Sequence, residues 1–393
     1  MSLGLGDRSA FPKLQPRSYL NHAAIAPVSV FVRDAVERVL EDYERRGVAA
    51  VFDWVEQRGR LKAVLAQLIG ADPTEIALSP STTRGLTDIA LCFPWQAGDR
   101  VLLFAGEFPA NITPWQQVAR EKQLTTRMHS ADAFRTHPEQ AWHNFVSELE
   151  RGVRLVAVSA VQFQTGHRMP ITRMAEACHA HGAQICVDAI QALGVVPLNV
   201  QQAGIDYLAC GSQKWLMGME GLGFVYVQSA RTPELVPVTA GWLSHEDPLA
   251  FLFEGAGRLS YDRPIRRSVD FMEGSATNAM GAAALEASVT ALLKLGVPAI
   301  HGHVQTFLDR LEPPLAAMGF ESRRSQLPTE RSGILSLAPP SKVDVVELHA
   351  RLMQAGVSCT LPDGLLRFSP HFSNSLDEVP SVVEAVSVAL AEL

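Results

Sequence analysis

The sequence contains few cysteines and no long uncharged apolar run, and each absence excludes a class of protein. Its 393 residues include five cysteines, an odd number without a C-x-x-C pair, which argues against a disulfide framework. The first residues lack a basic region followed by an apolar stretch, and no apolar run approaches the length of a membrane-spanning helix. We therefore expect a cytoplasmic protein without a membrane partner.

Basic charge is also scarce. The chain has 34 Lys and Arg against 41 Asp and Glu, a formal net charge of -7, which gives no electrostatic basis for binding nucleic acid. The histidine pairs His179/His181 and His301/His303 are spaced by two, so on a helix each pair points to different faces. We expect small-molecule partners and no metal site.

The region from Glu75 to Val227 has the rhythm of βα units, because short apolar runs alternate with longer amphipathic stretches. Runs that are apolar on both faces, such as 153–161, should be central strands of a mostly parallel sheet covered by helices. The sequence predicts strands at 76–79, 101–105, 124–129, 153–161, 184–189, 206–212 and 223–227.

A chain of this length exceeds what one compact core usually holds. A Gly- and Pro-bearing surface excursion follows Gly241, and helices are predicted at 276–295 and 298–318. The remainder reads strand, helix, strand, strand, helix, which is compatible with a small α+β domain. We predict a large domain at 26–285 and a small domain formed by 1–25 and 286–393.

The strongest chemical signal joins an acid to a lysine. Asp188 ends a predicted buried strand, and Lys214 follows the next strand, 26 positions later. A pyridinium cofactor needs both groups: the amine condenses with its aldehyde, and the carboxylate keeps its ring nitrogen protonated. Taken singly, Asp188 is better explained as a cap or turn residue and Lys214 as a solvated loop lysine.

Two stretches around these residues carry a family resemblance. VDAIQALGVVPLNV (187–200) and GIDYLACGSQKWLMGMEGLGFVYV (204–227) resemble the cofactor-lysine region of class V aminotransferases and cysteine desulfurases, pyridoxal-phosphate (PLP) enzymes of fold type I. The resemblance runs from about Tyr19 to the end of the chain. It implies an α/β fold like that of aspartate aminotransferase, with a mostly parallel sheet in the large domain, and pyridoxal 5'-phosphate as cofactor.

The resemblance assigns roles around the cofactor ring. It implies that Lys214 binds the cofactor as a Schiff base and later moves the α-proton of the substrate. Asp188 would pair with the pyridine nitrogen, and Gln191 would hydrogen-bond the ring hydroxyl oxygen, although Gln191 could instead be a surface residue. Phe108, in the segment 107–115, takes the position of the aromatic residue that stacks on the ring. Cysteine desulfurases usually have histidine there, and phenylalanine cannot titrate.

A phosphate site is expected where the strand at 76–79 meets a helix, since amides and hydroxyls gather at a helix N-terminus. Plain N-capping explains this segment equally well. The resemblance places the cofactor phosphate against Thr82 and Thr83, with Ser212 and Gln213 as further donors. The segment 273–278 resembles one that reaches the partner's phosphate, which assigns Thr277 to the cofactor and implies a homodimer with active sites at the interface.

On the substrate side, the resemblance makes Arg367 the residue that binds the α-carboxylate, for which its planar fork is suited. The alternative is a structural arginine paired with Asp363. His22 and Asn111 are weaker candidates for substrate contact. Cys359 lies in an apolar strand and reads as a buried small hydrophobe, so the mobile sulfur-accepting cysteine of desulfurases is expected to be missing.

We therefore predict a PLP enzyme that acts on an amino acid, most simply by transamination. A C–S lyase or another β-elimination, and an epimerase, use the same lysine and remain open. A binding or regulatory module without turnover is a remote alternative. A nicotinamide enzyme is disfavoured because no G-x-G-x-x-G joins the first strand to a helix.

Overall fold

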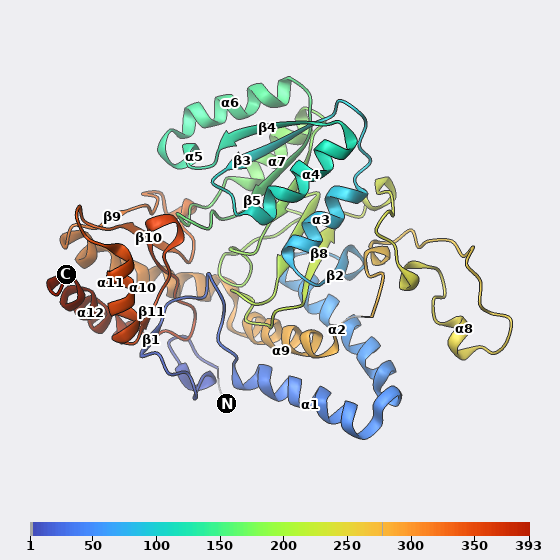
Figure 1. Ribbon diagram of the computed structural model, residues 1–393, viewed down its shortest axis with the longest axis horizontal. Coiled ribbons are helices and arrows are strands. Elements are labelled where there is room, and N and C mark those ends of the chain that lie inside the picture. The colour runs from blue at the N-terminus through green and yellow to red at the C-terminus, as the bar shows by residue number, and fades with distance from the viewer. Residues whose placement is uncertain (1–2, 277) are drawn as a thin grey trace.

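A seven-stranded mixed sheet forms the centre of the larger part of the molecule in the computed structural model, which describes residues 3–276 and 278–393 (Figure 1). The strand order is β2-β8-β7-β6-β5-β3-β4. All neighbours are parallel except β8, which runs antiparallel to both β2 and β7. The strands are β2 (Ile76–Ser79), β3 (Arg100–Ala105), β4 (Thr125–Ser130), β5 (Val153–Ser159), β6 (Gln184–Asp188), β7 (Tyr207–Gly211) and β8 (Gly223–Val227).

The burial of these strands follows their place in the sheet. Strands β6, β7 and β8 are buried at every position, whereas the edge strand β4 is mostly exposed. Central strands covered on both faces need apolar side chains in both directions, and their sequences supply them. The predicted mostly parallel, helix-covered sheet is confirmed.

Helices cover both faces of the sheet. Along β5, Leu155 and Ala157 pack into one core cluster and Val156 and Val158 into the other, as the alternation of a strand requires. The first cluster includes side chains of α3 (Thr82–Cys92) and α4 (Thr113–Lys122). The second includes those of α2 (Val51–Ile69), α6 (Pro138–Glu150), α7 (Ile171–Ala180) and α9 (Ala279–Leu295).

The C-terminal part forms a smaller α+β unit around the antiparallel sheet β12-β10-β9. Its strands are β9 (Glu321–Ser322), β10 (Leu335–Ala338) and β12 (Leu366–Phe368), and its helices are α11 (Val345–Gln354) and α12 (Val379–Ala391). The N-terminal strand β1 (Ser18–Tyr19) pairs with β11 (Val357–Ser358), so the start of the chain lies against this unit. The observed order from β10 to α12 matches the predicted strand, helix, strand, strand, helix.

Helices link the two parts. Helix α1 (Val30–Arg46) packs against α9, and α10 (Val297–Ala317) follows α9 across a 76° bend. Within the described residues no single helix is long and apolar enough to cross a membrane, and only the bent pair α9–α10 reaches the required length and composition. The predicted excursion after Gly241 carries the short helix α8 (Ala250–Phe253) and extends away from the sheet (Figure 1). The short helix α5 (Ala133–Thr136) lies between β4 and α6.

Candidate functional site

The predicted site residues gather at one edge of the large sheet. Asp188 is the last residue of β6, and Lys214 comes three residues after β7 ends. Phe108 follows β3, and Thr82 opens α3 after β2. Because parallel strands end at the same edge, these four elements deliver their side chains to one region.

Lys214 is partly buried, and its amine lies 5.6 Å from the centre of the Phe108 ring. Burial lowers the pKa of this amine to about 8, with Asp188 acting against the shift and Arg367 adding to it. Within residues 3–276 and 278–393, Lys214 forms no ion pair with a carboxylate. A lysine in these surroundings is neutral at lower pH than an ordinary lysine and so is prepared for attack on an aldehyde.

The turn that carries Lys214 is held by backbone contacts. The Met217 amide donates to the Lys214 carbonyl over 3.0 Å, and the Gly218 amide donates to the Ser212 carbonyl over 2.9 Å. The Ser212 hydroxyl donates to the Met219 carbonyl. The structure therefore uses the Ser212 hydroxyl to close this turn, and its predicted part in holding phosphate stays a prediction.

Asp188 is buried and accepts a hydrogen bond of 3.0 Å from the Ile190 amide. Burial raises the pKa of its carboxyl to about 7, and the nearby Glu107 raises it further, while the Ile190 amide and Lys214 act in the opposite direction. An acid with so little ionic compensation gains most when a cation is placed opposite it. A protonated pyridine nitrogen is such a cation.

Gln191 has a fixed amide orientation. Its Nε2 donates to the Ala23 carbonyl over 3.0 Å, and its Oε1 accepts from the Trp215 indole over 2.8 Å. The carbonyl can only accept and the indole N–H can only donate, so the two contacts agree on which amide atom is which. One Nε2 hydrogen remains to donate to a ring oxygen, and the surface alternative is excluded because Gln191 is buried.

The phosphate end of the site is closely packed. The buried Thr82 hydroxyl accepts from the Gly211 amide over 2.8 Å, which ties the start of α3 to the end of β7. A Cβ on Gly211 would lie 3.1 Å from Thr82 Oγ1 and 2.7 Å from Gln213 Oε1, so a larger residue would displace the Gln213 side chain and crowd Thr82. Thr83 is exposed on the same turn, and Ser81 caps the helix by accepting from the Arg84 amide over 3.1 Å. N-capping of α3 is therefore present, and contact of Thr82 and Thr83 with the cofactor phosphate stays a prediction.

Arg367 is a buried cation that pairs with no acid in the part of the chain that the structure describes. Its Nη1 donates to the Phe163 carbonyl over 2.7 Å and its Nε donates to Thr360 Oγ1 over 3.1 Å. Burial lowers the pKa of its guanidinium to about 10. Asp363, the acid of the structural alternative, accepts instead from Gln164 over 3.0 Å. An uncompensated guanidinium in this position suits a substrate carboxylate.

The remaining predicted residues have mixed surroundings. His22 is buried, with Nδ1 3.1 Å from the Ser369 carbonyl and its ring centre 5.2 Å from that of His371. Burial lowers the pKa of His22 to about 4, so the imidazole is neutral at physiological pH. Asn111 Oδ1 accepts from the Trp115 indole over 3.2 Å. Substrate contact by His22 and Asn111 stays a prediction, and Thr277 lies outside the described residues.

All five cysteines are buried. Burial raises the pKa of Cys359 to about 12, so its thiol is protonated at neutral pH. The expectation that Cys359 is a buried small hydrophobe agrees with this position, and the described residues offer no exposed thiol that could take up sulfur.

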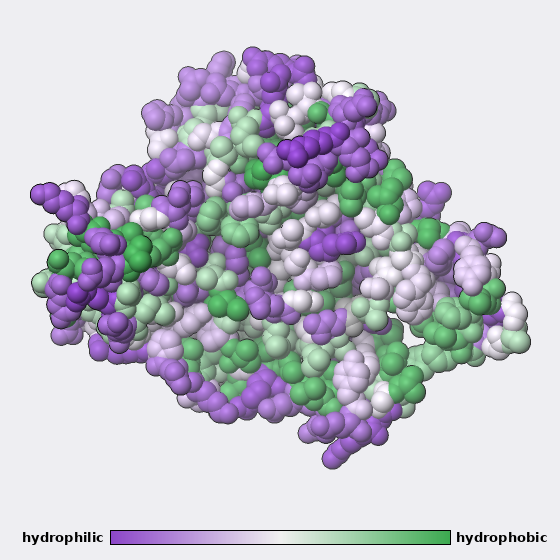
Figure 2. Space-filling view, in the orientation of Figure 1, coloured by the Kyte–Doolittle hydropathy of each residue, from purple (hydrophilic) through white to green (hydrophobic). Residues whose placement is uncertain are grey.

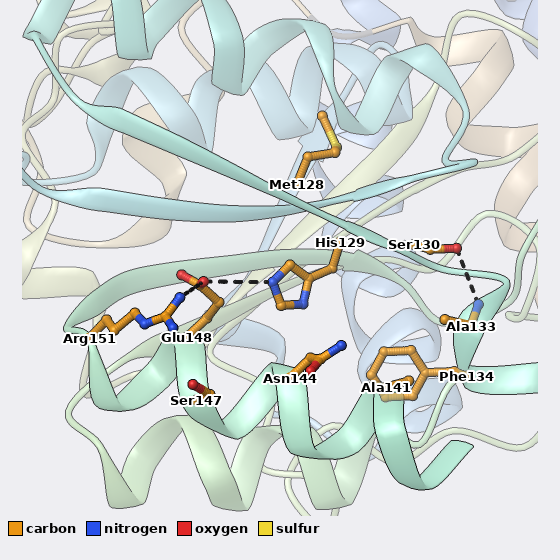
Figure 3. Close-up of a pocket in the computed structure, with 10 residues that line it drawn as sticks. All are labelled: Met128, His129, Ser130, Ala133, Phe134, Ala141, Asn144, Ser147, Glu148 and Arg151. Carbon is orange, nitrogen blue, oxygen red and sulfur yellow. Dashed lines mark hydrogen bonds and ion pairs between the residues drawn. The ribbon is translucent and has the colours of Figure 1, made fainter. Parts of the chain in front are cut away.

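A polar hollow of about 340 Å³ lies between β4 and α6 (Figure 3). Its Glu148 is paired with Arg151 at 2.5 Å, and the His129 imidazole points toward the same carboxylate at 3.9 Å. None of the predicted site residues lines this hollow. We refer to it as the β4–α6 hollow.

Sequence reasoning missed several residues that shape the site. Trp215 orients Gln191, and Phe163 contacts both Arg367, through its carbonyl, and the Phe108 ring, edge to face with ring centres 5.4 Å apart. Glu107 binds the end of β5 beside Asp188. The available signal was position for Trp215 and Glu107, which directly adjoin Lys214 and Phe108; no such signal marked Phe163.

Comparisons with known proteins agree with this geometry. The family model for aminotransferase class-V matches residues 18–379. The chain is 26% identical to the uncharacterized aminotransferase YcbU of Bacillus subtilis, covering 97% of this chain and 96% of that protein. It is also 26% identical to isopenicillin N epimerase of Streptomyces clavuligerus, covering 84% and 83% of the two chains.

Solved structures share the fold. The cysteine desulfurase CsdA of Escherichia coli superposes with a TM-score of 0.85 at 24% identity and covers 98% of both chains. The cystine C-S lyase C-DES, solved with its product cysteine persulfide, gives a TM-score of 0.86 at 19% identity, over 96% of this chain and 99% of that one. Another structure of C-DES has glycine covalently linked to the PLP cofactor.

The residues fit pyridoxal phosphate from one end to the other. The Lys214 amine has the lowered pKa that attack on its aldehyde needs, and the carboxyl of buried Asp188 accepts, among the described residues, only from the Ile190 amide, so it gains from a protonated ring nitrogen opposite it. Phe108 is 48% exposed beside Lys214, as a ring awaiting a stacking partner would be. The cofactor is pyridoxal phosphate, the fold is that of fold type I PLP enzymes, and the chain belongs to the class V aminotransferase family.

Proposed function

We propose that the protein is an aminotransferase that exchanges the amino group of an α-amino acid through Lys214. The observation that carries this proposal is a partly buried Lys214 amine of lowered pKa beside the Phe108 ring, together with an Arg367 guanidinium that pairs with no acid among the described residues. The cofactor supplies an electron sink for the charge left on the substrate Cα. The protein must then bind the carboxylate, orient the Cα–H bond and move one proton.

Lys214 is the proton carrier in this proposal. Its Nζ would take the proton from the substrate Cα and deliver it to the bound cofactor; water would then release the keto acid, with the amino group left on the cofactor. An amine with a pKa near 8 accepts and releases protons readily near neutral pH. Phe108 lies beside it but cannot titrate, so it adds shape and no second base.

Arg367 orients the substrate. Its Nη1 and Nε are anchored by Phe163 and Thr360, which fixes the plane of the guanidinium. A carboxylate held by this plane places the Cα of the amino acid relative to Lys214. Because Arg367 pairs with no acid among the described residues, a substrate carboxylate would neutralise its charge.

A C–S lyase is the second candidate. Cysteine desulfurases and a cystine C-S lyase are among the similar proteins, and elimination uses the same Lys214 base. The five cysteines are all buried, so such a lyase would release its sulfur product without a persulfide on its own chain. This observation separates a lyase from a desulfurase of the usual kind.

The deciding experiment incubates the purified holoenzyme with pools of amino acids, with and without a keto-acid acceptor. Transamination predicts continued formation of a new keto acid only when the acceptor is present; without the acceptor, the cofactor is converted to its amine form and about one equivalent of keto acid per chain is released. Pyruvate and sulfide without an acceptor would establish the lyase instead. Inversion of the amino acid, measured by chiral chromatography, would establish an epimerase.

We further propose a cytoplasmic homodimer. The excursion around α8 exposes Phe251, Leu252, Phe253, Leu259 and Tyr261, and Figure 2 shows apolar surface on this extension. Apolar side chains held away from the core favour burial against a second copy. In addition, Ser275 and Asn278 line a hollow with Ser79 and Pro80, beside the start of α3. Light scattering on the purified protein tests the dimer, and a monomer would contradict it.

A further inference from the structure

Glu107 is a buried acid that the proposed mechanism does not use. It is 8% exposed and lies in the turn after β3, directly before Phe108. The turn is possible because Gly106 adopts a φ of 94°, a left-handed conformation that favours glycine. Glu107 therefore points its carboxyl inward while Phe108 faces the site.

The hydrogen-bond partners of the Glu107 carboxylate all donate to it. Its Oε1 accepts from the Ser159 amide over 2.7 Å and from Gln162 Nε2 over 3.0 Å, and its Oε2 accepts from the Ser159 hydroxyl. No cation pairs with it among residues 3–276 and 278–393. Burial raises the pKa of Glu107, and the Ser159 and Gln162 donors act against this rise. The donor set favours the ionised carboxylate.

These contacts join Glu107 to the strand pair that carries Asp188. Ser159 is the register partner of Asp188 in the β5–β6 pair, and the Ala160 amide donates to the Asp188 carbonyl over 2.9 Å. Glu107 and Asp188 therefore both lie at the ends of β5 and β6. Besides Glu107, Lys214 is the charged group that shifts the pKa of Asp188. A negative charge on Glu107 adds to that of Asp188 and stabilises a protonated base placed opposite Asp188.

We propose that Glu107 is a positioning residue that places a second negative charge behind Asp188 and so keeps the ring nitrogen of the cofactor protonated. The proposal rests on the role of Asp188 in the proposed function, but not on whether the reaction is transamination or elimination. Glu107 touches neither substrate nor cofactor in this account. It acts through Asp188, and through its fixed place next to Phe108.

The test is the titration of the visible absorption band of the holoenzyme in the Glu107→Gln variant. Glutamine keeps the size of the side chain and removes the charge. Loss of a nearby negative charge destabilises the protonated cofactor, so the midpoint of the titration should fall by on the order of one pH unit. The affinity of the apoprotein for the cofactor, measured by fluorescence quenching, should weaken about tenfold.

Matched variants separate charge from structure. Glu75 is 5% exposed and accepts from the Asp72 and Ser229 amides over 3.0 and 2.8 Å, so Glu75→Gln should disturb packing to a similar degree without moving the midpoint. Glu107→Asp keeps the charge and should retain a midpoint near that of the unaltered protein. Gln162→Ala removes one hydrogen-bond donor from the Glu107 carboxylate and so makes its ionised form less stable. The titration midpoint should therefore fall, but by less than in Glu107→Gln.

The outcomes are decisive. An unchanged midpoint in Glu107→Gln, or a fall equal to that in Glu75→Gln, overturns the role of Glu107. If Glu107→Gln does not fold, the Gln162→Ala titration decides in the same way. A protein that takes up no cofactor at all would instead overturn the proposed function, because the band itself would be missing.

Discussion

The edge around Lys214 and the β4–α6 hollow both gather charged side chains, yet their charges are arranged in opposite ways. In the β4–α6 hollow, Glu148 is already paired with Arg151. At the Lys214 edge, the cation Arg367 is held by a carbonyl and a hydroxyl, and Asp188 by an amide. Unpaired buried charge is costly unless a ligand completes it, so the comparison supports the proposal that the Lys214 edge is the binding site.

Replacement of Lys214 should have the largest effect. Lys214→Ala removes the amine on which Asp188 and Arg367 both act, so we expect loss of the visible band and of activity by at least about a thousandfold. Absorbance and product assays on the purified variant measure both. Lys122→Ala, at an exposed site near the end of α4, is the matched control and should leave both unchanged. Retention of band and activity in Lys214→Ala would show that another lysine holds the cofactor.

Arg367 should matter next. Arg367→Lys keeps a positive charge but loses the planar fork, and we expect kcat/KM to fall about a hundredfold, mainly through KM. Steady-state kinetics with the identified amino acid measure the split. Arg151→Ala changes an arginine of the β4–α6 hollow and should not alter kinetics. An equal effect of both variants would remove the distinction between the Lys214 edge and the β4–α6 hollow.

The pH dependence of cofactor uptake sharpens the same comparison. Only the neutral Lys214 amine attacks an aldehyde, so uptake by the apoprotein should accelerate as pH rises through about 8 and then level off. The Asp188 carboxylate raises the pKa of this amine, so Asp188→Asn should move the midpoint to lower pH. Stopped-flow absorbance gives the rates. A midpoint near that of a free lysine, or a shift to higher pH in Asp188→Asn, would contradict the account.

The smallest effect is expected in the β4–α6 hollow. Glu148→Gln breaks the pair with Arg151, whose side chain is mostly exposed, so the free energy of unfolding should change by less than about 1 kcal/mol. Denaturant unfolding measures it, and the activity assay serves as the control. A loss of activity comparable to that of Arg367→Lys would assign this hollow a function that its paired charges do not suggest.

Much of the site could be predicted without knowing the order of the strands in the sheet. Asp188 and Lys214 follow apolar runs, and the carboxyl ends of parallel strands share an edge whatever their order. The antiparallel direction of β8 was not readable, since its residues are apolar on both faces like those of its parallel neighbours.

The contacts between distant segments could not be predicted. Glu107 binds Ser159 and Gln162, 52 and 55 positions away, and Arg367 binds the Phe163 carbonyl, 204 positions away. A sequence shows which side chains are able to form such hydrogen bonds. It does not show which distant residues the fold brings next to them. For the same reason the alternative pairing of Arg367 with Asp363 stayed open until Asp363 was found to bind Gln164.

The most direct test of the central claim is chemical labelling of the cofactor lysine. Borohydride reduction of the holoenzyme, followed by digestion and mass spectrometry, fixes the pyridoxyl group to the residue that holds it. We predict one label per chain, on the peptide that contains Lys214. A label on Lys62 or on any other lysine, or no label at all, would contradict the site described above.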